Sequence, residues 1–165
     1  MFLKALILPA LLLTTVPAIP PENQTKGASP SQHSAEAGAE QLLTALKTGD
    51  PAPAADFFFP AAAFDQVKDL PVPARYHEKL VRWYREDIQK EHARFKKGEW
   101  AFEKLEMGRC KWKAIGTEGN KLPYWSCTRN FVTATDGSRK RRFEIRVLIN
   151  WGQHWYVTHL GPIRK

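Results

Sequence analysis

Two carboxylates lie on the side of a predicted helix that should be apolar. Asp87 and Glu91 are four residues apart, so a helix places them next to each other, with Asp87 beside Trp83 and Glu91 between Leu80 and Tyr84. Two like charges in a poorly solvated site favour protonation of one of them, which general acid or base catalysis requires. His77 and Tyr84 lie on the same side of this helix. We therefore take Asp87 and Glu91 as candidate catalytic residues, and all four ionisable residues as candidate ligand-binding residues.

Ion pairing is the alternative role of these carboxylates. Arg94 follows Glu91 by three residues, which is within ion-pair reach on one helix. Arg109, Arg129 and Arg146 come from the part of the chain that this helix should cover. Acidic residues in such positions often belong to structural ionic networks. We favour structural pairing over catalysis at both positions.

Other chemical motifs are absent from the sequence. The five histidines have no metal-binding spacing, so we predict no metal site. No serine or cysteine stands in the context of a catalytic nucleophile, and no glycine pattern matches a phosphate-binding or dinucleotide-binding loop, so no cofactor is predicted. The basic run RKRR at residues 139–142 follows an Asp-Gly pair, which predicts a charged hairpin end rather than an import signal.

The first eighteen residues have the pattern of an export signal. Lys4 precedes an apolar run over residues 5–16, and Val16, Pro17 and Ala18 have the small-residue spacing of a cleavage site. The run is shorter than the roughly 20 apolar residues that cross a membrane. We predict a signal peptide at residues 1–18, a flexible Pro- and Ser-rich linker at 19–35, and a single domain at 36–165. The mature protein is then exported, to the periplasm or the extracellular space.

Helical periodicity dominates the first part of the predicted domain. Residues 36–47 form a predicted helix that Gly49 ends, and Asp50 begins a second short helix that stops at Pro60. The longest periodic segment is residues 74–97. Its apolar side carries Tyr76, Leu80, Val81, Trp83, Tyr84, Ile88 and Phe95.

Beyond Gly98 the pattern changes to the two-residue period of strands. We predict four antiparallel strands, at residues 100–115, 122–135, 139–151 and 154–160. The third alternates most clearly, with Phe143 and Ile145 on one face and Arg142 and Glu144 on the other. The predicted fold class is α+β, with N-terminal helices packed on a curved antiparallel sheet.

Cys110 and Cys127 are the only two cysteines. An even count in an exported protein favours a disulfide. With the turn centred at residues 118–119, Cys110 lies opposite Cys127 and Trp112 opposite Trp125. Opposed positions bring the two Cβ atoms close enough for a disulfide after a small adjustment. We predict that this bond joins neighbouring strands.

The positive charge is concentrated in the second part of the chain. Residues 19–108 carry twelve Lys and Arg against fourteen Asp and Glu, a net charge of −2, whereas residues 109–165 carry twelve against three, a net charge of +9. A basic face of an exported protein can bind anionic lipid or acidic glycan. The alternative is that these charges only solvate the exposed side of the sheet.

The order of elements resembles the NTF2-like superfamily, the cystatin-like α+β folds. Three helices precede a meander of long strands, with a Gly-Asp break after the first helix, the block FFFP at residues 57–60 and a closing strand WYVTHL at 155–160. The resemblance implies a sheet that curls around the long helix and leaves a cone, whose open end can form a pocket. An isomerase-type member would place an acidic base and a tyrosine hydroxyl inside that cone. The chain looks most like exported members of the superfamily.

These observations predict an exported, non-enzymatic binding or interaction module. It would hold a small ligand in the cone or an envelope protein on the sheet, and a homodimer through the sheet is a further possibility. One alternative is an isomerase or dehydratase that uses Asp87 or Glu91. Another is a basic sheet surface that binds anionic envelope lipid or glycan. No nucleic-acid partner is expected.

Overall fold

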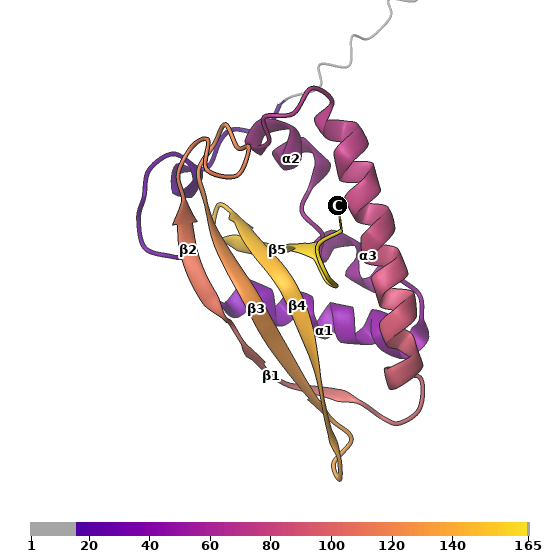
Figure 1. Ribbon diagram of the computed structural model, residues 1–165. Coiled ribbons are helices and arrows are strands. Elements are labelled where there is room, and N and C mark those ends of the chain that lie inside the picture. The colour runs from indigo at the N-terminus through magenta and orange to yellow at the C-terminus, as the bar shows by residue number, and fades with distance from the viewer. Residues whose placement is uncertain (1–15, 165) are drawn as a thin grey trace, which may run out of the picture.

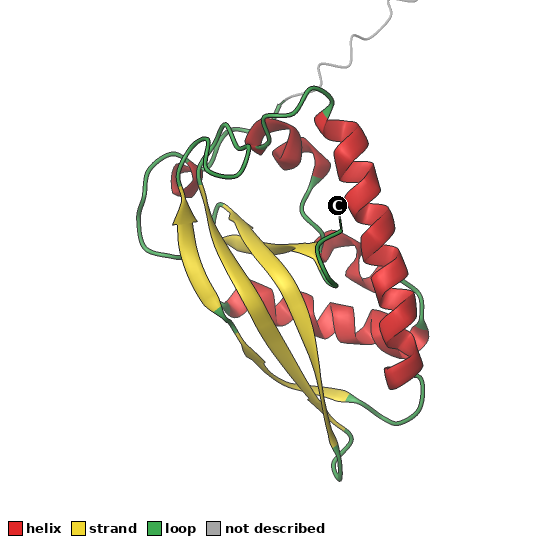
Figure 2. Cartoon of the chain, viewed as in Figure 1, coloured by secondary structure: helices red, strands yellow, loops and turns green. Residues whose placement is uncertain are grey.

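The computed structural model describes residues 16–164 and confirms the predicted α+β class. Helices pack on a five-stranded antiparallel sheet that does not close on itself (Figures 1 and 2). The helical elements are η1 (Pro21–Asn23), α1 (His33–Thr48), η2 (Ala52–Phe57), α2 (Ala61–Val67) and α3 (Pro73–Phe95). The strands are β1 (Ala101–Glu106), β2 (Arg109–Lys113), β3 (Tyr124–Thr135), β4 (Lys140–Trp151) and β5 (His154–His159).

The helices follow the predicted pattern with one addition. Gly49 ends α1 in the left-handed conformation, with φ of 76°, and its N–H caps the helix by donating to the Ala45 carbonyl. The Asp50 carboxylate accepts the N–H of Ala52 at 2.9 Å and starts η2. The short helix α2, which follows Pro60, was not predicted, because seven residues are too few to show a helical period.

The segment at residues 19–35 is not the flexible linker that its composition predicts. Asn23 is fully buried, and its side-chain amide donates to the carbonyl oxygens of Pro123 and Asn150. Its Oδ1 accepts the N–H of Gly152 at 2.7 Å, so one asparagine satisfies three backbone groups. These contacts fasten the segment to the turn between β4 and β5. Most of the predicted signal peptide, residues 1–15, lies outside the described residues.

The first predicted strand is broken into β1 and β2, both of which pair with β3. The break lies at Gly108, where a Cβ would overlap the carbonyl oxygen of Thr128. Opposite it, Arg129 has a positive φ of 59° and Asn130 is buried. The Asn130 side chain accepts the N–H of Gly108 and donates to the carbonyls of Cys127 and Ile145, in place of regular ladder bonds. The result is a local bend in β3.

The two faces of the sheet have different surroundings. On the back face, Cys127, Leu148 and Val157 are fully buried, and α1, which contacts β1 and β5, crosses behind the strands in Figure 1. We call the other side the front face. Ser126 lies opposite Ile149 on this face, since directly paired residues point to the same side. In Figure 1 the C-terminal end of the chain lies between the strands and α3.

The predicted disulfide and its register are confirmed. Cys110 is bonded to Cys127, with Cα atoms 4.0 Å apart, and the two residues are directly paired between β2 and β3. Trp112 is paired with Trp125, and their ring centroids lie 5.7 Å apart.

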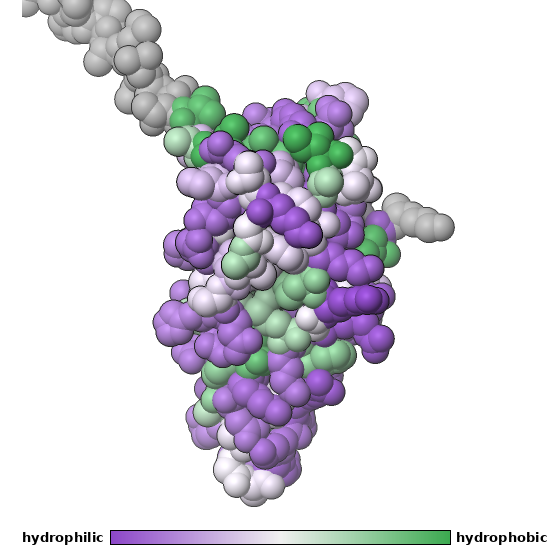
Figure 3. Space-filling model, turned by 90° about the vertical axis from the view of Figure 1, so that its left-hand side faces the viewer, coloured by the Kyte–Doolittle hydropathy of each residue, from purple (hydrophilic) through white to green (hydrophobic). Residues whose placement is uncertain are grey.

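Figure 3 views the molecule from the β2 side. Hydrophilic residues cover most of that face, and hydrophobic residues gather at its upper end.

Candidate functional site

The four predicted ligand-binding residues divide between two cavities. His77 and Tyr84 line a cavity of about 570 Å³ that η2 and α3 border. The His77 ring donates from Nε2 to the Phe59 carbonyl at 2.7 Å, and the Tyr84 hydroxyl donates to the Ala54 carbonyl at 3.1 Å. Burial raises the pKa of Tyr84 well above its usual value. Both polar groups therefore hold the η2 segment against α3.

Asp87 and Glu91 line a second cavity, of about 370 Å³, where α3 faces β4. Asp87 is 7% exposed, and its carboxylate accepts the N–H of Gly161 at 3.0 Å and the guanidinium of Arg164 at 2.5 Å. A Cβ on Gly161 would lie 2.7 Å from Oδ2 of Asp87. Asp87 thus pins the C-terminal segment to α3.

Glu91 has a different partner. It pairs with Arg94 at 2.6 Å, as the spacing of three residues suggests. Of the sheet arginines expected to pair with these carboxylates, Arg146 pairs with Glu144 instead. The two carboxylates do border one cavity, but each is held by its own basic partner. Neither is placed as an isolated acid or base in an apolar pocket.

A third cavity, of about 360 Å³, lies on the front face of the sheet, and we call it the front-face cavity. Ser126 and Thr128 of β3 and their partners Ile149 and Val147 of β4 form its floor. Residues of α2 and α3 form its walls, chiefly Phe64, Tyr76 and Leu80. The cavity is therefore mainly apolar on the helix side and mixed on the sheet side.

A chain of polar groups lies at one end of this cavity. Lys68 donates from Nζ to the Tyr124 hydroxyl at 2.8 Å, and this hydroxyl donates to Glu118 at 2.9 Å. Glu118 also pairs with Lys113. Tyr124 is 1% exposed, so its hydroxyl depends on these two partners.

The electrostatics of the cluster follow from burial and from these contacts. Burial lowers the pKa of Lys68, and Lys113 acts in the same direction, against Glu118. Burial alone would raise the pKa of Glu118, but hydrogen bonds from Lys113 and Tyr124 outweigh it and the pKa is lowered. Burial and the Glu118 charge raise the pKa of Tyr124, which stays a neutral phenol.

The backbone around residue 120 places this cluster. Lys68 comes directly after α2 and forms a β-bridge with Asn120, supported by the hydrogen bond from the Asp69 N–H to the Gly119 carbonyl at 2.8 Å. The buried Asn120 side chain accepts the N–H of Glu118 and donates to two carbonyls of its own turn. One asparagine therefore fixes the loop that carries Glu118 beside Lys68.

His159 is the other ionisable group of the front-face cavity. Its Nδ1 lies 3.2 Å from the Thr158 hydroxyl, and its Nε2 is buried with no hydrogen-bond partner among residues 16–164. Burial lowers the pKa of His159, and the charge of Lys68 lowers it further, while Asp87 opposes them. These effects favour the neutral ring.

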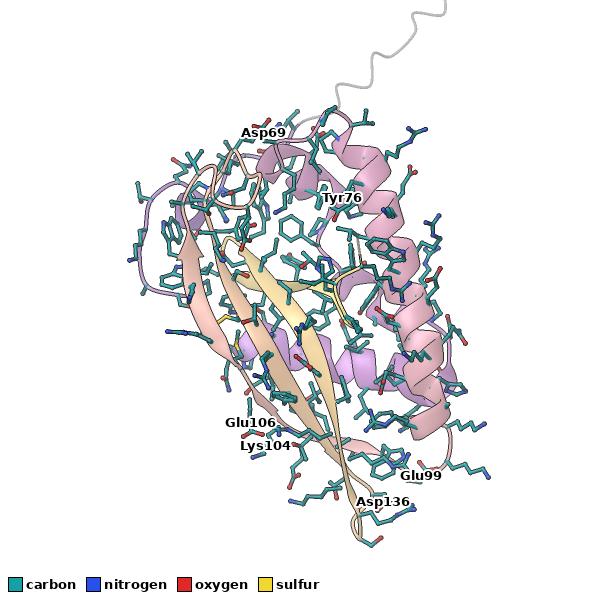
Figure 4. All side chains as sticks on the ribbon, viewed as in Figure 1. Asp69, Tyr76, Glu99, Lys104, Glu106 and Asp136 are labelled. Atoms are coloured by element: carbon teal, nitrogen blue, oxygen red, sulfur yellow. A yellow bond between two sulfur atoms is a disulfide. The ribbon has the colours of Figure 1, made fainter. Side chains whose placement is uncertain are left out.

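Exposed apolar side chains are also part of this cavity. Leu70, Tyr76 and Ile163 line it and are 36%, 37% and 61% exposed. Figure 4 shows Tyr76 on α3, and its ring centroid lies 6.1 Å from that of Phe64 in α2. Exposed apolar surface beside a cavity is typical of a ligand-binding site.

Sequence reasoning missed this cluster. Lys68, Glu118, Tyr124 and His159 come from four separate segments and share no spacing. His159 belongs to the closing strand at residues 155–160, and Glu118 to the turn between the paired cysteines, but neither position predicts a site. No group of three His, Cys, Asp or Glu in residues 16–164 is arranged to hold a metal ion.

Comparisons with known proteins add no homologue. No protein-family model, curated protein or solved structure matches this chain. Within the described part of the chain, no helix has the length and apolar character needed to span a bilayer.

Proposed function

We propose that this protein is a non-enzymatic binding module that holds a small amphipathic anion in the front-face cavity. The observation that carries this proposal is the half-buried Lys68 at one end of a largely apolar cavity. The volume of about 360 Å³ falls in the range of small-molecule sites, roughly 300–1,000 Å³. A ligand with a short apolar body fits this space.

The charge balance of the cluster supports an anionic head group. Lys68 and Lys113 share a single carboxylate, Glu118, so the cluster has one more cation than anion. An anion beside Lys68 would offset the desolvation that lowers the pKa of this lysine. The neutral His159 ring adds a hydrogen-bonding group at the same cavity. We infer that the ligand is a short-chain carboxylate or a close chemical equivalent.

The contacts of the α3 carboxylates favour a binding module over an enzyme. An isomerase or dehydratase would need Asp87 or Glu91 to be available to a substrate proton. Asp87 accepts hydrogen bonds on both carboxylate oxygens, and Glu91 pairs with Arg94. Structural roles account for both residues.

We also propose that the protein is exported and that its domain is NTF2-like. The disulfide supports an oxidising compartment, because such bonds are rare in the cytosol. Helices that precede an antiparallel meander, with a pocket on one sheet face, support the NTF2-like proposal.

Octanoate and octanol, which differ in the charge of the head group, provide the test. Calorimetry should detect octanoate binding to the purified protein, with octanol weaker by roughly tenfold, since a hydrogen bond to a charged group contributes about 1.5–3 kcal/mol. Lys68→Met should weaken octanoate binding by a similar factor and abolish the preference over octanol. Thr128→Trp should fill the cavity and abolish both.

Lys121→Met is the matched control, because Lys121 is exposed and outside the cavity. It should bind both probes as the wild type does. Circular dichroism should show that each variant is folded. No binding of either probe, or equal binding to wild type and Thr128→Trp, would refute the proposed site.

A further inference from the structure

The hairpin run at residues 139–142 is the most basic stretch of the sequence, but its charges are already used within the fold. Figure 4 labels Asp136 at the hairpin end, where it accepts hydrogen bonds from Arg139. The side chain of Arg141 lies 4.7 Å from the ring centroid of Trp100, which is a cation–π contact. The other two cations have acidic partners: Lys140 with Glu103 at 2.5 Å and Arg142 with Glu106 at 3.5 Å.

Three cations without an acidic partner lie close to one another, around β2 and the bend of β3. Arg109, Lys111 and Arg129 are exposed, and none has a carboxylate within 4.0 Å in the described part of the chain. Arg109 and Lys111 are paired with Thr128 and Ser126, so both point to the front face. Being two residues apart on a strand, they are spaced by about 6.7 Å.

Two of these cations, Arg109 and Arg129, border a shallow hollow. Arg109, Arg129 and Arg142 line a shallow cavity of about 490 Å³. Arg142 and Phe131 also line the 370 Å³ cavity beside α3, to which Arg94 contributes. The two hollows therefore adjoin each other, because Phe131 and Arg142 line both. We call Arg109, Lys111 and Arg129 the basic strip, together with Arg142, whose side chain stays 52% exposed despite its pairing with Glu106.

We propose that the basic strip binds a linear polyanion, specifically an acidic polysaccharide. Adjoining hollows lined by cations suit an extended chain that carries charge along its length. Single-stranded nucleic acid requires aromatic platforms, and here Arg142 covers the Phe131 ring at 3.9 Å.

The exposed aromatic residues argue in the same direction. Among the described residues, Tyr76 is the large aromatic side chain that is exposed, and it lies on α3 outside the strip.

The basic strip is also distinct from the front-face cavity, with which the 490 Å³ hollow shares only Thr128. Loss of one site should therefore leave the other intact.

Heparin binding by the double variant Arg109→Glu/Lys111→Glu tests the proposal. The matched control is Lys26→Glu/Arg75→Glu, which changes the net charge equally at exposed positions away from the strip. Affinities are measured by calorimetry with the full chain from 50 to 300 mM NaCl. We expect the strip variant to lose at least tenfold in affinity and to show a shallower dependence on salt, and the control to change less than about twofold.

Three outcomes would overturn the proposal. Equal losses in the two double variants would show only a general effect of net charge. Unchanged heparin binding together with self-association of the strip variant would mean that the cations on the β2 edge serve to prevent strand pairing. Tighter strip-dependent binding to polyuridylate or to phosphatidylglycerol vesicles than to heparin would identify a different partner. Thermal unfolding of all variants checks that the fold is kept.

Discussion

The hydroxyl of Tyr124 should contribute measurably to stability, and Tyr124→Phe removes this one oxygen. The hydroxyl is buried, accepts a hydrogen bond from Lys68 at 2.8 Å and donates one to Glu118 at 2.9 Å. A hydrogen bond to a charged group contributes about 1.5–3 kcal/mol. Glu118 is 38% exposed and keeps Lys113, so it recovers part of its loss from water and from that ion pair.

Most of the expected cost therefore comes from Lys68, which is half-buried and has the Tyr124 hydroxyl as its one side-chain hydrogen-bond partner within residues 16–164. We expect Tyr124→Phe to lower the free energy of unfolding by about 2 kcal/mol. For a chain of this size, this corresponds to a decrease in Tm of roughly 4–8 °C. Urea unfolding at neutral pH, followed by tryptophan fluorescence, measures the change.

Tyr156→Phe is the matched control. The Tyr156 side chain is half-buried and its hydroxyl makes no hydrogen bond within residues 16–164. Its loss should change stability by less than about 0.5 kcal/mol. A double-mutant cycle of Tyr124→Phe with Lys68→Met should give a coupling energy of about 1–2 kcal/mol. Equal stabilities for the two phenylalanine variants, or a coupling energy near zero, would refute the assigned role.

Three further predictions concern other contacts. Replacing both cysteines by alanine should cost about 3 kcal/mol in chemical unfolding, because the disulfide closes a loop with a sequence separation of 17. Gly161→Ala places a Cβ 2.7 Å from Oδ2 of Asp87, so amide hydrogen exchange at residues 160–164 should accelerate. Gly27→Ala is the control, because its Cβ has no atom within 4 Å and should leave the exchange unchanged. The pKa of His159 is lowered from 6.5, so the unfolded chain binds more protons and stability should fall as the pH drops below about 6.5; unfolding curves of His159→Gln should lack this decline.

Local periodicity was enough to predict the element types. The helical period of residues 74–97 and the alternation around Phe143 and Ile145 arise from backbone geometry within one segment. The pairing of Cys110 with Cys127 also followed from local arithmetic, because an antiparallel hairpin couples positions that are equidistant from its turn. Glu91 likewise found the partner that helix spacing suggested.

The errors occurred where contacts between distant segments replace local ones. A composition rich in Pro and Ser predicted a linker at residues 19–35, yet Asn23 binds backbone groups more than 100 residues away. The break at Gly108 depends on the Asn130 side chain, which takes over ladder bonds from another strand. Composition and periodicity do not predict which side chain will hydrogen-bond to backbone groups of a distant segment.

The sequence by itself determined the fold class, the disulfide and the concentration of positive charge in the second part of the chain. Only the tertiary structure decided where the basic strip and the front-face cavity lie. Lys68, Tyr124 and His159 line one cavity because the sheet and the helices around α3 bring their segments together. In the hairpin, Arg139 is paired with Asp136. Burial and pairing depend on atoms that are close in space but distant in the chain, so no local pattern encodes them.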